Sequence, residues 1–402
     1  MPTTNGGPKR FSPAKVVVSL AVFALVLKIL LAYVTLGTND ATTWENDLVK
    51  LRADGFAELY RDGVYLPDDP AHHYPQYFIH PPPVLHILKT FGAFEESTGL
   101  PLRFWLRLLC AFADLATLCL VWRIRGPGTD WRALALLALS PIGITISGFH
   151  MNTDPVMICF VVASVWFVER KQFGIAGVAF GLAAGIKLVP VLFVPAFLLY
   201  LPDHRNRLRW ALAALATWLV IGLPYLAREP GLILSRILGY GGWTGWWGIY
   251  LLLRFLLIAM GFDAPAGLLA GPGKWLALAS IVAIPVYLRL TGRRPPLFDQ
   301  CGAVVFAFLL LSPGFGFQYL AWSSPWIVAL GFGPTARYYL VAGAFLTGSY
   351  AQAAWGSGLH AYANFMRNDR FSMMLGPFCW LALGVAALGF IRKLKATPVR
   401  EV

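Results

Sequence analysis

The feature that most restricts the fold of this sequence is a series of long apolar stretches with few or no charges. Many approach the roughly 20 residues that a helix needs to cross a bilayer. Only 13% of the 402 residues are charged, against about 25% in a soluble globular chain. Inside lipid, one continuous apolar segment satisfies its backbone hydrogen bonds only as a helix. The sequence therefore predicts an all-α membrane protein that forms a single polytopic domain over residues 1–402.

The basic residues predict how the chain threads the membrane. Lys9 and Arg10 at the start, and Arg392 and Lys393 near the end, favour a cytoplasmic location for both termini. Threading the apolar stretches through the membrane gives about twelve spans, which alternate between the two faces. The expected spans are about 14–36, 101–123, 273–290, 298–311, 317–331, 335–355 and 372–391, with the others between Arg132 and Ala227.

Two long segments are expected on the extracytoplasmic face. Residues 37–100 are too polar to span, and we expect them to form a first outer loop that carries short surface helices. Residues 228–272 contain an apolar run, Trp246–Met260, that could span the bilayer. If it did, Arg293 and Arg294 would lie outside, which the distribution of basic residues disfavours. A surface-lying or re-entrant helix is therefore the preferred interpretation.

Several features of the composition carry no chemistry of their own. The net charge of +13 suggests nucleic-acid binding, but the basic residues lie in short loops, so membrane topology explains them better. The five cysteines are scattered without metal-binding spacing, and we interpret them as small hydrophobic residues. Trp243, Trp246 and Trp247 are expected to form a belt at the membrane interface. No nucleotide-binding loop, zinc-protease motif or serine elbow occurs.

Polar side chains gather at the outer ends of the expected spans. Asp40 follows the first span, His150–Asp154 joins the third and fourth, and Lys187 ends the fifth. A further turn, Ser312–Tyr319, joins the ninth and tenth spans. Ionisable residues at membrane depth are costly and by default indicate function. The sequence therefore predicts one site on this face, assembled from segments that are far apart in the chain.

Each of these residues also has a structural interpretation. Asp40 could be a solvated loop acid, and Asp47 is its rival for a functional role. Asp154 followed by Pro155 is typical of the first turn of a helix. Lys187 could extend to the lipid headgroups, or it could bind a lipid phosphate, for which lysine is a good point charge. The two acids, Asp40 and Asp154, could share a divalent cation such as Mg²⁺ or Mn²⁺, or divide base and orienting roles.

Short motifs in these segments resemble those of the GT-C superfamily of integral membrane glycosyltransferases, which use polyprenyl-phosphate-linked sugars. The chain is most similar to bacterial mannosyltransferase-like members and more distantly to eukaryotic dolichyl-phosphate-glucose enzymes. The resemblance covers most of the chain in layout and only short segments in motif. These segments are Asn39–Trp44, Phe78–Pro82, Gly148–Pro155, Ile186–Pro190 and Gly314–Tyr319.

The resemblance implies a role for each matching residue. Asp40 matches the acid of the first outer loop, which acts as catalytic base or orients the acceptor, and His150 and Asp154 match the assisting motif. Lys187 matches the basic residue that binds the donor phosphate, and Arg254 is a weaker match. The remaining candidates are substrate-binding residues, namely His80, Asn152, Gln318 and Tyr319. Metal use varies in the superfamily, so a divalent cation held by the two acids stays open.

The expected function is transfer of a hexose, with mannose favoured, from a polyprenyl-phosphate donor to a lipid-linked, glycan or protein acceptor. The reaction inverts the anomeric configuration at the extracytoplasmic face of a bacterial plasma membrane. One alternative is a transporter or flippase of lipid-linked sugars, although the sequence shows no related halves and places its polar residues at one end. The other alternative is a non-catalytic relative that only binds lipid.

Overall fold

The computed structural model describes residues 12–65, 75–126, 128–239, 247–263, 270–354 and 370–399, and these residues form helices and turns without a strand. The first helices are α1 (Pro13–Val34), α2 (Asn39–Ala53), α3 (Phe56–Asp62), α4 (Pro83–Thr98), α5 (Leu102–Arg125), α6 (Trp131–Ala138), α7 (Pro141–Thr145), η1 (Ile146–His150), α8 (Asp154–Glu169), α9 (Phe173–Ile186), η2 (Val189–Phe193) and α10 (Val194–Tyr200). They are followed by α11 (His204–Leu226), α12 (Pro230–Gly239), α13 (Gly248–Ala259), α14 (Ala270–Leu290), α15 (Leu297–Leu311), η3 (Phe317–Tyr319), α16 (Leu320–Ser323), η4 (Trp326–Leu330), α17 (Phe332–Ala354) and α18 (Arg370–Ala396). Of these, η1 is a π-helix and η2, η3 and η4 are 3₁₀ helices.

Long apolar helices confirm that the chain is an integral membrane protein of the all-helical class. Among the described residues, six helical stretches are long and apolar enough to cross a membrane, namely Pro13–Val34, Leu102–Arg125, Trp131–His150, His204–Leu226, Ala270–Leu290 and Ser372–Ala396. Other expected spans are shorter. Helix α9 has 14 residues and would rise about 21 Å, less than the roughly 30 Å hydrocarbon core. The expected number of about twelve spans is therefore not confirmed and stays a prediction.

Local sequence signals set the ends of these helices. The Asp203 side chain accepts a hydrogen bond from the Asn206 amide at the start of α11, as an N-cap does. Helix α5 ends at Gly126, whose φ of 70° is a conformation that glycine adopts without strain. Helix α4 ends at Gly99 in the same way, with a φ of 73°. The turns between the long helices are therefore encoded locally, and the apolar stretches between them pack into one bundle.

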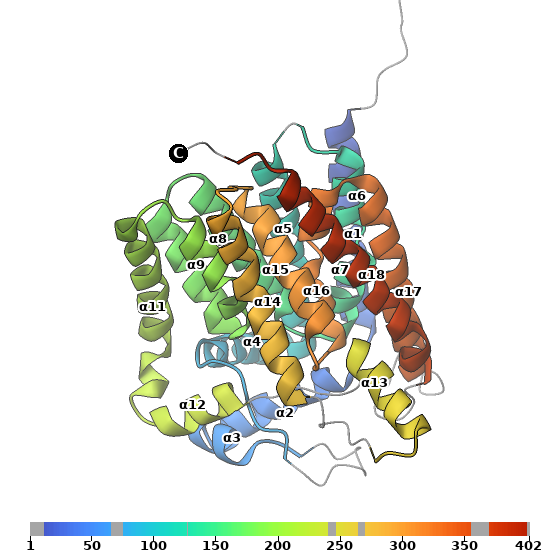
Figure 1. The fold of residues 1–402 in the computed structure, drawn as a ribbon. Helices are drawn as coiled ribbons and strands as arrows, with labels where there is room; N and C mark the ends of the chain where they lie inside the picture. The colour runs from blue at the N-terminus through green and yellow to red at the C-terminus, as the bar shows by residue number, and fades with distance from the viewer. Residues whose placement is uncertain are drawn as a thin grey trace, which may run out of the picture.

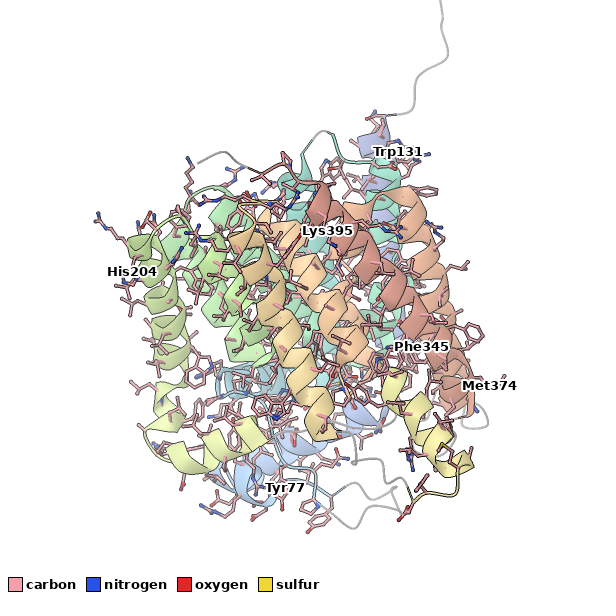
Figure 2. All side chains as sticks on the ribbon, in the orientation of Figure 1. Tyr77, Trp131, His204, Phe345, Met374 and Lys395 are labelled. Atoms are coloured by element: carbon pink, nitrogen blue, oxygen red, sulfur yellow. The ribbon has the colours of Figure 1, made fainter. Side chains whose placement is uncertain are left out.

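Charged contacts join the ends of several helices at one end of the bundle. Arg125 of α5 and Lys393 of α18 both pair with Asp299 of α15, at 3.2 and 2.9 Å. Glu169 of α8 accepts hydrogen bonds from the Leu297 amide and from the hydroxyl of Tyr200. We call the end of the bundle that carries Arg125, Lys393 and Glu169 the basic end. It lies on the upper side in Figure 2, near the labelled residues Trp131, His204 and Lys395, whereas Tyr77 lies on the opposite side.

The described part of the segment 37–100 folds against the opposite end of the bundle. Helices α2, α3 and α12 lie together below the long helices in Figure 1. Their apolar side chains form a second core, which includes Trp44, Tyr60, Phe78 and Tyr225. The expected short helices are present as α2, α3 and α4, and residues 66–74 lie outside the described residues. This layer covers the end of the bundle at which Asp40 lies.

The two long helices that adjoin residues 228–272, α11 and α14, both have the ends nearest to this segment at the opposite end of the bundle. Helix α11 begins at the basic end, where Gly174 at the start of α9 lies against Arg209. Arg293, just after α14, donates to the Thr397 carbonyl at 2.5 Å, so α14 finishes at the basic end. Tyr250 of α13 contacts Gly273 near the start of α14 and donates to the Leu311 carbonyl at the far end of α15. With 12 residues, α13 would rise about 18 Å, less than the roughly 30 Å hydrocarbon core, so the expectation of a surface-lying or re-entrant helix stays a prediction.

The expected tryptophan belt is wrong for Trp247. Its side chain is 3% exposed and stacks on Phe315 with ring centroids 3.6 Å apart. Its indole N–H donates to the Leu309 carbonyl at 3.1 Å. A buried tryptophan that satisfies its donor inside the protein packs as a core residue rather than as an interfacial anchor. Trp243 and Trp246 lie outside the described residues.

Candidate active site

A tight turn between α1 and α2 positions Asp40. Arg107 of α5 is fully buried and donates to the Thr35 carbonyl at 2.9 Å, at the end of α1. Gly37 has a φ of 97°, and a Cβ there would lie 2.0 Å from the Arg107 guanidinium. Only glycine fits this turn. Thr38 then caps α2 by accepting the Asp40 amide, so the Asp40 carboxylate lies at the helix N-terminus, where the helix dipole favours a negative charge.

A second turn brings His150, Asn152 and Asp154 to the same place. The π-helix η1 ends at His150, and Met151 adopts a φ of 67°, which is unusual for a residue with a side chain. The Thr38 hydroxyl donates to the His150 carbonyl at 2.8 Å and ties this turn to the start of α2. Both π-helical turns and left-handed residues are frequent at functional sites, where the surrounding structure holds the strain.

Hydrogen bonds connect five side chains into a single chain, which we call the Asp40 network. His150 Nε2 lies 3.1 Å from Asp40 Oδ2, and Asn152 Nδ2 donates to the same oxygen at 2.9 Å. Lys187 Nζ donates to Asn152 Oδ1 at 3.0 Å and to Asp154 Oδ2 at 2.6 Å. The sequence-predicted residues Asp40, His150, Asn152, Asp154 and Lys187 therefore do meet in one site.

The two acids of the network have different surroundings. The Asp154 side chain is fully buried, and its oxygens accept from Lys187 and from the indole of Trp322. The Asp40 side chain is 31% exposed, and both of its described side-chain bonds reach Oδ2. Asp40 Oδ1 thus has no side-chain hydrogen bond among the described residues. Asp154 instead holds Lys187 in place.

Electrostatics keep Asp40 ionised. Burial raises the pKa of this carboxyl, but the charge and hydrogen bond of His150, with the hydrogen bond of Asn152 and the charge of Lys187, outweigh it and leave the pKa lowered. Burial and the nearby charge of Lys187 lower the pKa of His80 to about 3, so this imidazole is neutral near pH 7. His80 stacks on Trp44 with ring centroids 4.5 Å apart. It is therefore a neutral polar group beside the ionised Asp40.

Asp47, the rival acid on α2, has the opposite character. Its side chain lies in the second core, with the residue 3% exposed, and its Oδ1 has no hydrogen-bond partner. Burial raises the pKa of Asp47 well above its ordinary value of 3.8. A raised pKa keeps a carboxyl protonated to higher pH, which disfavours a role as general base. Between the two acids, the structure favours Asp40.

Asp47→Asn is expected to leave catalysis unchanged and to alter the pH dependence of stability. Because the folded chain holds the Asp47 proton more tightly than the unfolded chain, this group stabilises the fold most below pH 3.8. That stabilisation is lost as pH rises through the raised pKa of the folded state. The variant, which has no proton to lose, should therefore gain thermal stability relative to the parent as pH rises. Melting curves in detergent at several pH values measure this, and a constant difference would contradict it.

The other candidate residues lie at varying distance from the network. The Tyr319 ring stacks on Trp322, with centroids 4.1 Å apart, and so touches the residue that bonds Asp154. Gln318 precedes it on η3 and is half-buried. Arg254 lies on α13, which packs against α15 and α18. Its role as a phosphate ligand stays a prediction.

The residues do not fit a metal shared between Asp40 and Asp154. Lys187 already places a positive charge on Asp154, and Asn152 stands between the two acids. Within the described part of the chain, no three His, Cys, Asp or Glu side chains converge as a metal site. The cation that this geometry provides between the acids is the ammonium group of Lys187.

Sequence reasoning missed several polar residues that the structure brings to or near the site. Tyr350 of α17 bonds His150 at 3.0 Å, and Trp322 bonds Asp154. Lys28 of α1 pairs with Asp114 of α5 at 2.5 Å, deeper in the bundle. The sequence did contain a signal for Lys28, Asp114 and Arg107, because each is a charged residue inside an apolar stretch, where charge is costly in a membrane. Nothing in the sequence singled out Tyr350 or Trp322 from other aromatic residues.

The fold and the site together define the class: an all-helical membrane protein with a carboxylate network at one end of its bundle, beneath the layer of short helices. The model of glycosyltransferase family 87 matches residues 78–313, more than half of the chain. The chain therefore belongs to this family, a membrane glycosyltransferase family of the GT-C type, as the resemblance implied. The matched range includes His150, Asn152, Asp154 and Lys187 and begins after Asp40. No curated protein matches the chain.

Proposed function

We propose that this membrane glycosyltransferase moves a hexose, with mannose favoured, from a polyprenyl-phosphate donor to a lipid-linked, glycan or protein acceptor. The observation that carries the proposal is the Asp40 carboxylate, which is ionised and held through Oδ2 by His150 and Asn152, so that Oδ1 is open. A carboxylate in this state can accept the proton of an acceptor hydroxyl. Lys187, close to Asp40 through Asn152, supplies the positive charge that a phosphate leaving group requires.

The chemistry follows from these positions as a single displacement. The acceptor oxygen attacks the anomeric carbon while the bond from that carbon to the phosphate oxygen breaks. The electron pair of the broken bond stays on the polyprenyl phosphate, whose charge Lys187 stabilises. The acceptor proton passes to Asp40 Oδ1. Positive charge that develops on the sugar in the transition state is stabilised by the Asp40 carboxylate, and the configuration inverts.

Lys187 has room for this second role. An ammonium group has three N–H donors, and Asn152 and Asp154 accept two of them. The third donor remains for a phosphate oxygen. Asp154, which is fully buried, compensates the charge of Lys187 when no sugar substrate is bound. Lys187 therefore does not need to enter the site from solvent each time a polyprenyl-phosphate sugar binds.

The membrane arrangement that we propose has about twelve spans, with the short helices packed among the long ones. Both termini and the basic end face the cytoplasm of a bacterium, in line with the rule that basic residues stay inside. The segments 37–100 and 228–272 then lie on the extracytoplasmic face of the plasma membrane. The Asp40 network opens to that face, where a polyprenyl-phosphate sugar presents its head group.

A transporter or flippase of lipid-linked sugars is the alternative function. Such proteins bind their substrate near the middle of the membrane, between related halves. The Asp40 network lies instead at helix ends, beside the layer formed by α2, α3 and α4. A non-catalytic relative that only binds lipid would have no need of an ionised carboxylate beside a histidine. The site geometry therefore favours the enzyme.

Turnover of defined donors tests the proposal. Purified protein is incubated with polyprenyl-phosphate mannose, glucose and galactose, and with nucleotide-linked hexoses, in the presence of a bacterial membrane extract as acceptor. We expect release of polyprenyl phosphate together with a glycosylated product, most strongly for mannose. Release from nucleotide-linked sugars alone would contradict the donor class. Movement of an intact polyprenyl-phosphate sugar across vesicles without cleavage would support the transporter.

A further inference from the structure

Tyr350 reaches the Asp40 network from the far end of the chain. It lies in the last turns of α17, and its hydroxyl is 3.0 Å from His150 Nδ1. The residue is 5% exposed, and its ring packs against Phe149 and Phe317 with centroid distances of 5.5 and 6.0 Å. The packing fixes the ring, and so the hydroxyl faces the imidazole. Tyr350, His150 and Asp40 thus form a hydrogen-bonded line that ends at the open carboxylate.

The two nitrogens of His150 are therefore both engaged, and their roles are linked. Asp40 is ionised and can only accept, so His150 Nε2 must carry a proton in order to bond it. In a neutral imidazole, the other nitrogen then has only a lone pair. That lone pair needs a donor, and the Tyr350 hydroxyl is the group that faces it. If the ring is protonated, the Tyr350 oxygen can accept the Nδ1 proton instead.

We propose that Tyr350 is the positioning residue that keeps the Nε2–H of His150 directed at Asp40. This inference rests on the proposed role of Asp40 as the base. A hydroxyl serves both protonation states of the ring, because it can donate to Nδ1 or accept from it. Without the hydroxyl, the neutral imidazole is free to carry its proton on Nδ1. A lone pair on Nε2 would then face the Asp40 carboxylate, which repels it.

The order of the three groups differs from that of a serine-type triad. There, a carboxylate orients a histidine that acts as the base. Here, a tyrosine orients a histidine that in turn holds the carboxylate, and the carboxylate is the base. Oδ2 is bound by His150 and Asn152, which leaves Oδ1 facing the acceptor. The hydroxyl of Tyr350 thus acts on the reaction through His150 and does not touch the substrate.

Tyr350→Phe tests this role because it removes the hydroxyl and keeps the ring. With the donor that is most active in the wild type, we expect kcat to fall about 10- to 100-fold, the range seen when a group that orients a metal-ligating histidine is removed. The KM values for donor and acceptor should change less than kcat. Loss of the bond from His150 also makes Asp40 easier to protonate, so the acid limb of the pH profile should move to higher pH. Lys187, His80 and Asp154, the other titratable groups around Asp40, are the same in both proteins.

Tyr338→Phe is the matched control. Tyr338 lies on the same helix, is buried, and bonds the Ser323 hydroxyl away from the network. It loses the same atom from the same helix, so its kcat and acid limb should stay at wild-type values. If kcat of Tyr338→Phe fell as much as kcat of Tyr350→Phe, the loss would follow from removing a buried hydroxyl anywhere on α17. That result would overturn the positioning role of Tyr350.

His150→Gln provides a second background. A glutamine amide can donate to Asp40 and has no tautomer to control, so Tyr350→Phe should change its kcat less than twofold. Equal losses in both backgrounds would mean that the hydroxyl acts independently of His150. Nitrogen NMR of labelled His150 reports the tautomer directly, without turnover. An unchanged tautomer in Tyr350→Phe would overturn the inference, whereas a wild type that transfers no sugar would overturn the proposed function instead.

Discussion

Asp40→Asn is expected to abolish sugar transfer from a polyprenyl-phosphate donor while leaving expression and folding intact. An amide at this position keeps the size of the side chain but cannot accept the acceptor proton. General base catalysis contributes about 10²- to 10⁴-fold, so transfer should fall by at least that range. The rate of polyprenyl phosphate release under saturating donor and acceptor measures the loss. The main effect should be on kcat, because Asp40 acts on the transition state.

Asp47→Asn is the matched control for this experiment. It makes the same change on the same helix, to an acid that is buried in the second core and whose pKa is raised by that burial. Its transfer rate should remain at the wild-type level. Undiminished transfer by Asp40→Asn would remove Asp40 from the mechanism. If only Asp47→Asn lost activity, the roles of the two acids would be reversed.

Lys187→Ala is expected to raise the KM for the donor about 10- to 100-fold, with a smaller effect on the acceptor. The loss corresponds to removing one hydrogen bond to a charged group, about 1.5–3 kcal/mol. The same change leaves Asp154 fully buried without its cation, which costs stability as well. Initial rates at varied donor and acceptor concentrations separate the two KM values.

A double variant separates binding from folding. Lys187→Ala combined with Asp154→Asn removes the uncompensated charge, so thermal stability should recover. Donor affinity should not recover, because the phosphate still lacks its cation. A normal donor KM in the double variant would assign the effect of Lys187 to stability alone. A change confined to the acceptor KM would place Lys187 on the wrong substrate.

Local patterns in the sequence predicted the membrane class and the position of the site. Apolar length predicts helices, and the distribution of basic residues predicts which helix ends share a face. That reasoning placed Asp40, His150, Asn152, Asp154 and Lys187 at one end, and the structure joins them by hydrogen bonds. It also predicted short helices rather than a span in residues 37–100, and the described part of this segment contains α2, α3 and α4.

The sequence could not predict contacts that depend on how distant helices pack. Tyr350 meets His150 across 200 positions, and no local pattern links the two residues. The burial of Trp247, contrary to the expected interfacial belt, results from its stacking on Phe315. Asp40 and Asp47 both lie on α2, and they differ in burial because different residues surround them. The sequence of the helix does not show this difference. The number of spans is uncertain from sequence because helices inside a bundle can be shorter than the bilayer.

The anomeric configuration of the product tests the proposed direct displacement most directly. The product is formed by the wild-type protein from a polyprenyl-phosphate hexose of known configuration, and its new glycosidic bond is assigned by NMR coupling constants. With Asp40 as base and no covalent sugar intermediate, the configuration must invert. Retention would require a covalent glycosyl-enzyme or an equivalent double displacement. That result would contradict the mechanism proposed for the Asp40 network.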